Sequence, residues 1–209
     1  MASSLAWSLP PTTWAAVSMT ETDTRPLAAL DERSLIDACL AGEAGAFDLI
    51  VERHRRSIYQ LCYRFVGNHE DASDLSQDVF LRAFRGLKNF RGQSSIATWL
   101  YRIGVNVCLN RVNAKAPLNQ PADPIDDYQL VDVRSESPAD RILKQERDAR
   151  VRAAIAQLPE KQRAALILRT YHEMSHQEIA DVLGSSVGAV KANFFHALGH
   201  LKKLLGDEI

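Results

Sequence analysis

The sequence predicts an all-α protein made of two small helical domains joined by an extended linker. Hydrophobic residues recur at three- and four-residue spacing through most of the chain, and no segment shows the alternating pattern of a half-buried strand. Between two such helical blocks, residues 113–140 lose this periodicity, contain four prolines and are rich in acids. This composition is typical of an extended tether between domains.

The domain boundaries are predicted from these changes of pattern. Residues 1–28 lack a basic start, and Pro10 and Pro11 interrupt their apolar stretch. They are therefore expected to form a disordered extension rather than a secretion signal or a membrane span. The first domain is expected at residues 29–112, the linker at 113–140 and the second domain at 141–207. The sequence does not decide whether translation begins at Met1 or at Met19.

Three or four packed helices are expected in the first domain. One should end at Gly67 and Asn68, because this pair is typical of a helix C-terminus. The next is expected to have Asp71 at its N-terminus, as a cap or as a complement to the helix dipole. A further helix should open at Ser94 or Ser95, with Trp99 on its apolar face and therefore in the core.

Charge is distributed in blocks, although the net charge of the chain is only −1. Residues 45–111 carry ten Arg or Lys against six acids, and residues 141–205 carry eleven against six. The segments before and between these blocks are acidic. Screening confines exposed charges to a range of about 10 Å, so each basic block can present its own field to a polyanion. Ordinary solvated helix faces would give the same count.

The segment His172-Glu-Met-Ser-His176 matches the motif that places two zinc ligands and a catalytic glutamate on one helix. However, Ser175 and Glu178 form a Ser-x-x-Glu capping box, which predicts that a new helix begins between the two histidines. A third ligand is not evident, and the three cysteines are far apart in the sequence. We therefore expect no metal, no cofactor and no catalytic residues, with a zinc hydrolase as a remote alternative.

The segment that follows has the spacing of a helix-turn-helix. Ala180 permits close approach of two helices, Gly184 makes the turn and Val190 packs the second helix back. Ser185 or Ser186 is expected to cap that second helix. Its core face is predicted to contain Val187, Val190, Phe194, Leu198 and Leu201. A plain helical hairpin has the same local pattern.

Three segments together resemble the extracytoplasmic-function group of bacterial sigma factors. They are DASDLSQDVFLRAFRGL, FRGQSSIATWLYRIGVNVCLN and LPEKQRAALILRTYHEMSHQEIADVLGSSVGAVK, and the resemblance covers roughly residues 30–205. It implies a region 2 domain that binds the clamp helices of RNA polymerase and melts the −10 promoter element. It also implies a region 4 domain that contacts the polymerase flap and reads the −35 element.

The resemblance also implies roles for individual residues. Those on the polymerase-binding helix are Asp71, Asp74, Gln77 and Asp78. Those available to the melted −10 strand, whose flipped base would enter the loop from Phe90 to Ala97, are Lys88, Phe90, Arg91, Gln93, Ser94, Arg102, Asn106 and Arg111. Those facing the −35 element are Ser186, Ala189, Lys191, Ala192, Asn193, Phe195 and His196.

The second helix of the helix-turn-helix departs from the family pattern. Asn193, His196 and Leu198 stand where the group commonly has arginines, which predicts fewer phosphate contacts or a different base preference. The expected function is a non-enzymatic, cytoplasmic promoter-specificity subunit. Its expected partners are core polymerase, promoter DNA and an anti-sigma factor. The alternative is a stand-alone helix-turn-helix regulator.

Overall fold

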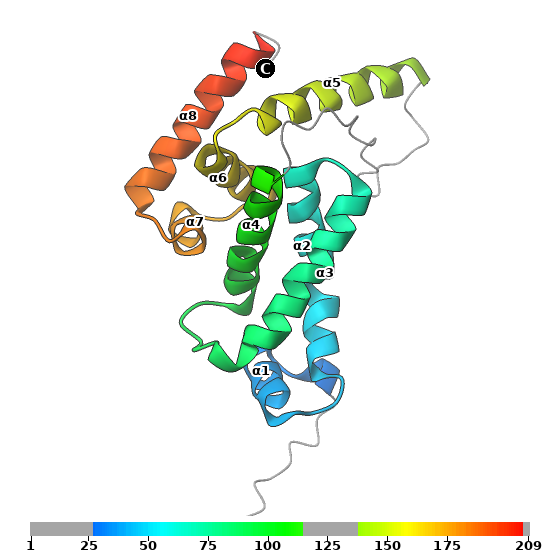
Figure 1. The fold of residues 1–209 in the computed structure, drawn as a ribbon, viewed down its shortest axis with the longest axis vertical. Helices are drawn as coiled ribbons and strands as arrows, with labels where there is room; N and C mark the ends of the chain where they lie inside the picture. The colour runs from blue at the N-terminus through cyan, green and yellow to red at the C-terminus, as the bar shows by residue number, and fades with distance from the viewer. Residues whose placement is uncertain (1–26, 115–137, 207–209) are drawn as a thin grey trace, which may run out of the picture.

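The computed structural model describes residues 27–114 and 138–206, and within these ranges all regular structure is helical (Figure 1). A short 3₁₀ turn, η1 (Leu27–Ala29), precedes the first helix, and a second one, η2 (Leu87–Asn89), follows the third. The α-helices are α1 (Glu32–Ala41), α2 (Ala46–Val66), α3 (His69–Gly86), α4 (Ile96–Ala114), α5 (Pro138–Ala156), α6 (Glu160–Tyr171), α7 (His176–Leu183) and α8 (Val187–Leu205).

Local sequence signals explain where most of these helices begin and end. Gly67 terminates α2 in the left-handed conformation, as predicted. Asp71 lies in the first turn of α3, where its charge complements the helix dipole as one of the two alternatives predicted. The N-cap is Asn68, whose side chain accepts the hydrogen bond from the backbone N–H of Asp71. Ser95 accepts the N–H of Thr98 at the start of α4, at 3.0 Å.

The first helical bundle is built from α2, α3 and α4, with α1 packed across the N-terminal part of α2 (Figure 1). Its core contains the fully buried side chains of Leu61, Val79 and Leu100. Gly104 lies where α4 meets α2. A Cβ atom at that position would lie 2.7 Å from Cδ2 of Leu61, so the absence of a side chain allows this close approach.

The second bundle consists of α6, α7 and α8, and the C-terminal part of α5 contributes Ala154 and Ile155 to its core. One prediction for α8 is wrong. Leu198 is 46% exposed, and Ala197 is fully buried in its place. After Phe194 the inward face of α8 continues three residues later at Ala197, then four residues later at Leu201, which is the helical alternation of three and four.

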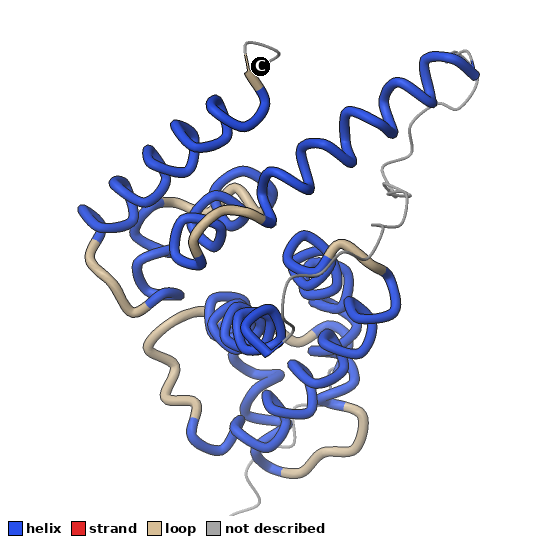
Figure 2. The backbone as a smooth tube through the Cα atoms, turned by 45° about the horizontal axis from the view of Figure 1, so that its top comes forward, coloured by secondary structure: helices blue, strands red, loops and turns tan. Residues whose placement is uncertain are grey.

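The two bundles pack against each other through α4 and α7 (Figure 2). The hydroxyl of Tyr101 on α4 lies 3.0 Å from Nδ1 of His172, and the two rings meet edge to face at 4.9 Å. The guanidinium of Arg64 on α2 lies 3.9 Å from the centre of the Tyr171 ring. Arg102 donates a hydrogen bond to the backbone carbonyl of Asp181 on α7. Buried apolar side chains of the two bundles also belong to one continuous cluster, so the interface combines polar, aromatic and apolar contacts.

The structure extends the predicted domain boundaries by a few residues. Helix α4 continues to Ala114 and α5 begins at Pro138, whereas the domains were expected to end at 112 and to resume at 141. Most of the predicted linker and of the N-terminal extension lies outside the described residues. In the described part of the chain, no helix is both long enough and apolar enough to span a bilayer.

Replacing Gly104 with Ala should destabilise the first bundle by about 1–2 kcal/mol, because Leu61 must move within a closed core. The control is Gly199→Ala in α8, where an added Cβ would meet no atom within 4 Å. That change should stabilise the helix by about 0.5–1 kcal/mol. Urea denaturation followed by circular dichroism measures both. Equal effects of the two changes would contradict the close packing of α2 on α4.

Candidate nucleic-acid interface

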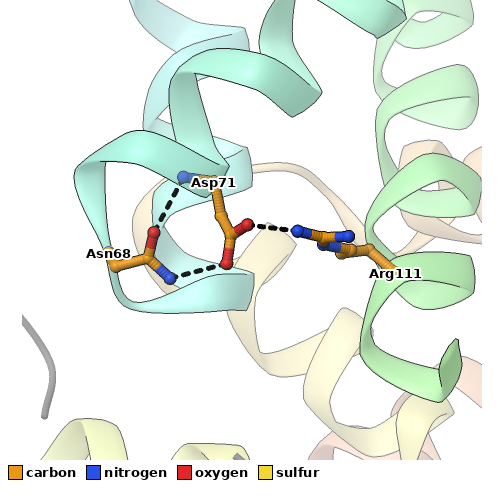
Figure 3. A network of polar contacts seen from close by, with 3 residues as sticks. All are labelled: Asn68, Asp71 and Arg111. Carbon is orange, nitrogen blue, oxygen red and sulfur yellow. Dashed lines mark hydrogen bonds and ion pairs between the residues drawn. The ribbon is translucent and has the colours of Figure 1, made fainter. Parts of the chain in front are cut away.

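The first predicted polymerase contact, Asp71, lies inside an ion-pair network rather than on the surface (Figure 3). Asp71 is only 7% exposed. One carboxylate oxygen accepts from the Asn68 amide at 2.8 Å, and the other lies 2.5 Å from the guanidinium of Arg111. The network ties the start of α3 to the end of α4, which leaves Asp71 and Arg111 engaged with each other.

The other predicted polymerase contacts lie on the outer face of α3. Asp74 and Gln77 are exposed. Asp78 is half-buried and forms an ion pair with Arg82, one helical turn later, at 2.9 Å. Because both side chains of that pair remain solvated, it contributes little to stability. These three residues therefore offer carboxylate and amide groups to a partner.

An apolar hollow beside Gln77 was not predicted from the sequence. It has a volume of about 670 Å³ and lies between the turn after α1, the start of α2 and the face of α3. Leu81 is 54% exposed and Phe84 is 63% exposed, and the ring of Phe84 meets that of Phe47 at 5.0 Å. An exposed apolar patch next to polar groups is typical of a protein-binding surface. The sequence signal for this surface is the spacing of Leu81 and Phe84, which lie three residues apart on the face of α3 opposite Val79 and Ala83.

The predicted −10 residues before α4 lie on η2 and on the loop that follows it. Lys88, Arg91 and Gln93 are exposed, whereas Phe90 and Ser94 are half-buried. The Phe90 ring contacts the ring of Trp99 at 5.2 Å. Trp99 is half-buried and packs against the core. The loop thus combines cations with an aromatic ring, which are the groups used to bind single-stranded nucleic acid.

The predicted −10 residues on α4 differ in availability. Asn106 is exposed. Arg102 is also exposed, but it donates to the backbone of Asp181 on α7. Arg111 is held by Asp71. In this arrangement α7 therefore binds Arg102, one of the cationic residues that the sequence assigned to DNA.

Helix α8 presents most of the residues predicted for the −35 element. Ser186 caps the helix by accepting the N–H of Ala189 at 3.2 Å. Asn193 and Ala189 are half-buried, and the ring of Phe195 is 74% exposed. Ser186, Lys191, Ala192, Phe195 and His196 are exposed. A helix that follows a tight turn and exposes such a face has the geometry of a recognition helix.

The two histidines of the protease-like motif are separated as the capping box predicted. Ser175 and Glu178 form both reciprocal hydrogen bonds, so α7 begins after Ser175. His172 precedes α7 and faces Tyr101, while His176 contacts the ring of Phe194 at 6.1 Å. Within residues 27–114 and 138–206, no group of three or more His, Cys, Asp or Glu side chains is placed to hold a metal. The motif therefore lacks the single helix that a zinc hydrolase requires.

Comparisons with known proteins identify the family of this chain. A family model described as sigma-70 region 2 matches residues 50–117, and one described as sigma-70 region 4 matches residues 148–201. The RNA polymerase sigma-H factor of Pseudomonas aeruginosa is 36% identical over 182 residues, covering 83% of this chain and 93% of the relative. The extracytoplasmic-function (ECF) sigma factor SigW of Bacillus subtilis is 32% identical over 172 residues, covering 79% and 92%. The chain belongs to the ECF group of the sigma-70 family.

A solved structure has the same fold as this chain. CnrH, in complex with the cytosolic domain of CnrY, superposes with a TM-score of 0.62 at 27% identity. The superposition covers 85% of this sigma factor and 99% of CnrH. In the present chain, region 2 thus corresponds to the bundle that contains α2, α3 and α4. Region 4 corresponds to the bundle that contains α6, α7 and α8.

The stability of the sigma factor should depend on pH through His172. Burial and the nearby Arg64 lower the pKa of His172 from 6.5 to about 4, so its ring is neutral in the folded chain at pH 7. As pH falls from about 6.5 to about 4, His172 becomes protonated in the unfolded chain but stays largely neutral in the folded chain. The free energy of unfolding should therefore fall through this window, by about 3 kcal/mol at most.

The matched variant is His172→Gln, which keeps a hydrogen-bonding side chain but does not titrate. Urea denaturation of both proteins between pH 7 and pH 4.5 measures the difference in slope. His54, whose pKa is also lowered by burial, contributes equally to both proteins. Parallel curves for wild type and variant would contradict the neutral state of the half-buried His172 ring.

Proposed function

We propose that this ECF sigma factor binds core RNA polymerase through α3 and directs transcription initiation by contacting two promoter elements. The loop after η2 and part of α4 would hold the melted −10 strand, and α8 would read the −35 element. The observation that carries the proposal is the presence of three separate exposed surfaces on one chain of this family. One is acidic and apolar, one is cationic and aromatic, and one is a helix-turn-helix.

The proposed polymerase contact consists of Asp74, Gln77 and Asp78 together with the apolar hollow beside them. Leu81 and Phe84 supply exposed apolar area, which can be buried in a complex, and the carboxylates supply charge complementarity to a basic partner. Asp71 is left out of this set, because its carboxylate is occupied by Asn68 and Arg111. Its role in the proposal is to fix α3 relative to α4.

The proposed −10 surface contains Lys88, Phe90, Arg91, Gln93 and Asn106. The cations would hold phosphates, and aromatic rings recover the stacking that an extruded base loses. Arg102 joins this set only when α7 moves away, because its guanidinium is bonded to Asp181 in the arrangement seen here. Contact of Arg102 with DNA therefore requires that α7 first move away from α4.

The proposed −35 surface is the exposed face of α8. Lys191 and the capped N-terminus of the helix would contact phosphates, and Asn193, Phe195 and His196 would contact base edges or thymine methyl groups. Helix α8 contains no arginine, so we infer fewer phosphate contacts here than in relatives that carry arginines on this face.

Further properties follow from the proposal. Catalysis would belong to the polymerase, and the sigma factor would itself perform no chemistry and would act in the cytoplasm. CnrH was solved in complex with the cytosolic domain of CnrY, and RpoE of Bartonella quintana, at 19% identity and a TM-score of 0.60, was solved with the anti-sigma factor NepR. An anti-sigma factor is therefore proposed as a partner of this chain also.

In vitro transcription with purified core polymerase and a library of promoter fragments tests the function. The expected result is transcripts, dependent on the added chain, from fragments that share sequence near −35 and −10. A chain that binds duplex DNA but neither copurifies with core nor starts transcripts would instead be a stand-alone regulator.

Reversing the charge of the α3 surface should weaken binding to core polymerase. Asp74→Lys combined with Asp78→Lys adds repulsion and also breaks the pair with Arg82, so we expect a loss of at least tenfold in affinity. The control reverses two exposed acids elsewhere, Glu52→Lys with Glu146→Lys. Fluorescence anisotropy with core enzyme measures both. Equal affinities for the α3 variant and the control would contradict this contact.

Substitutions in α8 should separate phosphate binding from base reading. Lys191→Ala should weaken −35 binding at all sequences and make the dependence on salt shallower by about one counterion. Asn193→Ala and His196→Ala should change which −35 sequences are selected, because a lost base contact costs about 1–3 kcal/mol at one position only. Selection of promoters from a library measures this. An unchanged preference in both variants would remove the base-reading role from these residues.

A further inference from the structure

The apolar hollow beside α3 lies at the end of the first bundle where the described chain begins. The hollow, of about 670 Å³, is lined by the turn after α1, by Phe47 and Val51 of α2 and by Leu81 and Phe84 of α3. Figure 1 shows η1, drawn in dark blue, at the end of the bundle where α1 lies, and η1 contacts α2. The hollow and the point at which residues 1–26 join the bundle are therefore at the same end.

The start of the described chain is fixed to α2. The guanidinium of Arg53 donates hydrogen bonds to the carbonyl oxygens of Ala28 and Leu30, at 3.1 and 2.9 Å. Leu27 packs against the buried core. The segment that precedes Leu27 is therefore tethered to the N-terminal half of α2, which also forms part of the hollow.

The segment before this anchor has a composition that suits an apolar hollow. Residues 1–18 contain no charged side chain, and they include two of the three tryptophans of the chain, Trp7 and Trp14. At about 3.3 Å per residue, the stretch between Trp14 and Leu27 spans up to about 40 Å, whereas a helix with its side chains is about 10–12 Å across. Both tryptophans can therefore reach the hollow from the anchor.

The hollow is large enough and apolar enough to bind an indole ring. Its volume is within the range of sites that hold drug-sized molecules, which are larger than one tryptophan side chain. Leu81 is 54% exposed and Phe84 is 63% exposed, so both lose apolar exposure when the hollow is covered. A tethered segment meets the hollow at an effective concentration on the order of millimolar, so even a weak contact is well populated.

We propose that residues 1–18 bind in this hollow, with a tryptophan ring against Phe84, and thereby cover the surface of α3 that is proposed to bind polymerase. The regulatory part of this inference rests on the proposed function, whereas the docking itself does not. A chain that begins at Met19 lacks both N-terminal tryptophans, so its hollow stays open. The choice between Met1 and Met19 as the first residue then sets the affinity for polymerase.

Tryptophan fluorescence of the full chain tests the docking without polymerase. In a Trp99→Phe background, Trp7 and Trp14 are the only tryptophans. Acrylamide should quench these docked rings several times less efficiently than it quenches a free peptide of residues 1–18. Quenching as efficient as that of the free peptide would overturn the docking. Protection that rises with protein concentration would mean that the segment binds a second copy of the chain, and would overturn docking within one chain.

Two variants of α3 locate the docking site. Phe84→Ser and Leu81→Ser each remove an exposed apolar side chain of the hollow, so each should restore the quenching of the free peptide. The matched control Phe195→Ser removes an exposed ring from α8 and should leave the protection unchanged. Protection that persists in both α3 variants would overturn the assignment of the segment to this hollow.

Binding of the full chain to core polymerase tests the regulatory part. Trp7→Ser combined with Trp14→Ser should raise the affinity about tenfold, which corresponds to a wild-type hollow that is covered about nine-tenths of the time. The matched control, Ser3→Ala with Ser4→Ala, alters the same segment without removing an apolar side chain and should have no effect. Fluorescence anisotropy with core enzyme measures all three proteins.

Failure of this inference is distinguishable from failure of the proposed function. If Asp74→Lys with Asp78→Lys weakens binding to core while the tryptophan variant binds like wild type, α3 is the polymerase contact and the segment does not cover it. That result overturns the autoinhibition alone. If neither change alters the affinity, the proposed contact on α3 fails, and the regulatory part fails with it. The fluorescence measurement decides the docking in both cases.

Discussion

The packing of α4 is the constraint on which the arrangement of this sigma factor depends. One side of α4 is buried against α2 and α3, where Gly104 permits the close approach of Leu61. On another side, Tyr101 and Arg102 hold His172 and Asp181 of region 4. The same helix continues the loop that we assign to the −10 strand. Helix α4 is thus shared between the internal contact of the two bundles and the proposed DNA surface.

Because α4 belongs to both the contact between the bundles and the proposed DNA surface, the proposed steps of initiation follow a definite order. The outer face of α3, with Leu81 and Phe84, is exposed while the bundles are in contact, and so is the face of α8 that carries Phe195. Core polymerase can therefore meet α3 before the bundles separate, whereas Arg102 becomes available only afterwards. The interface includes hydrogen bonds and an aromatic contact that can be exchanged for contacts with polymerase and DNA.

The sequence predicted what local patterns determine and missed what distant contacts determine. The capping box at Ser175, the turn at Gly184 and the cap at Ser186 depend on neighbours within four residues, and all three are present. The burial of Asp71 depends on Arg111, which is 40 residues away in the sequence. The contact of Tyr101 with His172 spans 71 residues. Helical periodicity predicts which face of a helix is buried, but it does not predict which residue of another helix a given side chain will contact.

The most direct test of the shared role of α4 is the distance between the bundles in solution. Dyes on engineered cysteines, Glu70→Cys in α3 and Lys203→Cys in α8, can be placed in a Cys39→Ser background, in which the two remaining cysteines, Cys62 and Cys108, are buried. Single-molecule energy transfer should report one short distance for the free chain and a longer one in the complex with core polymerase and promoter DNA. The same short distance in that transcriptionally active complex would contradict the account.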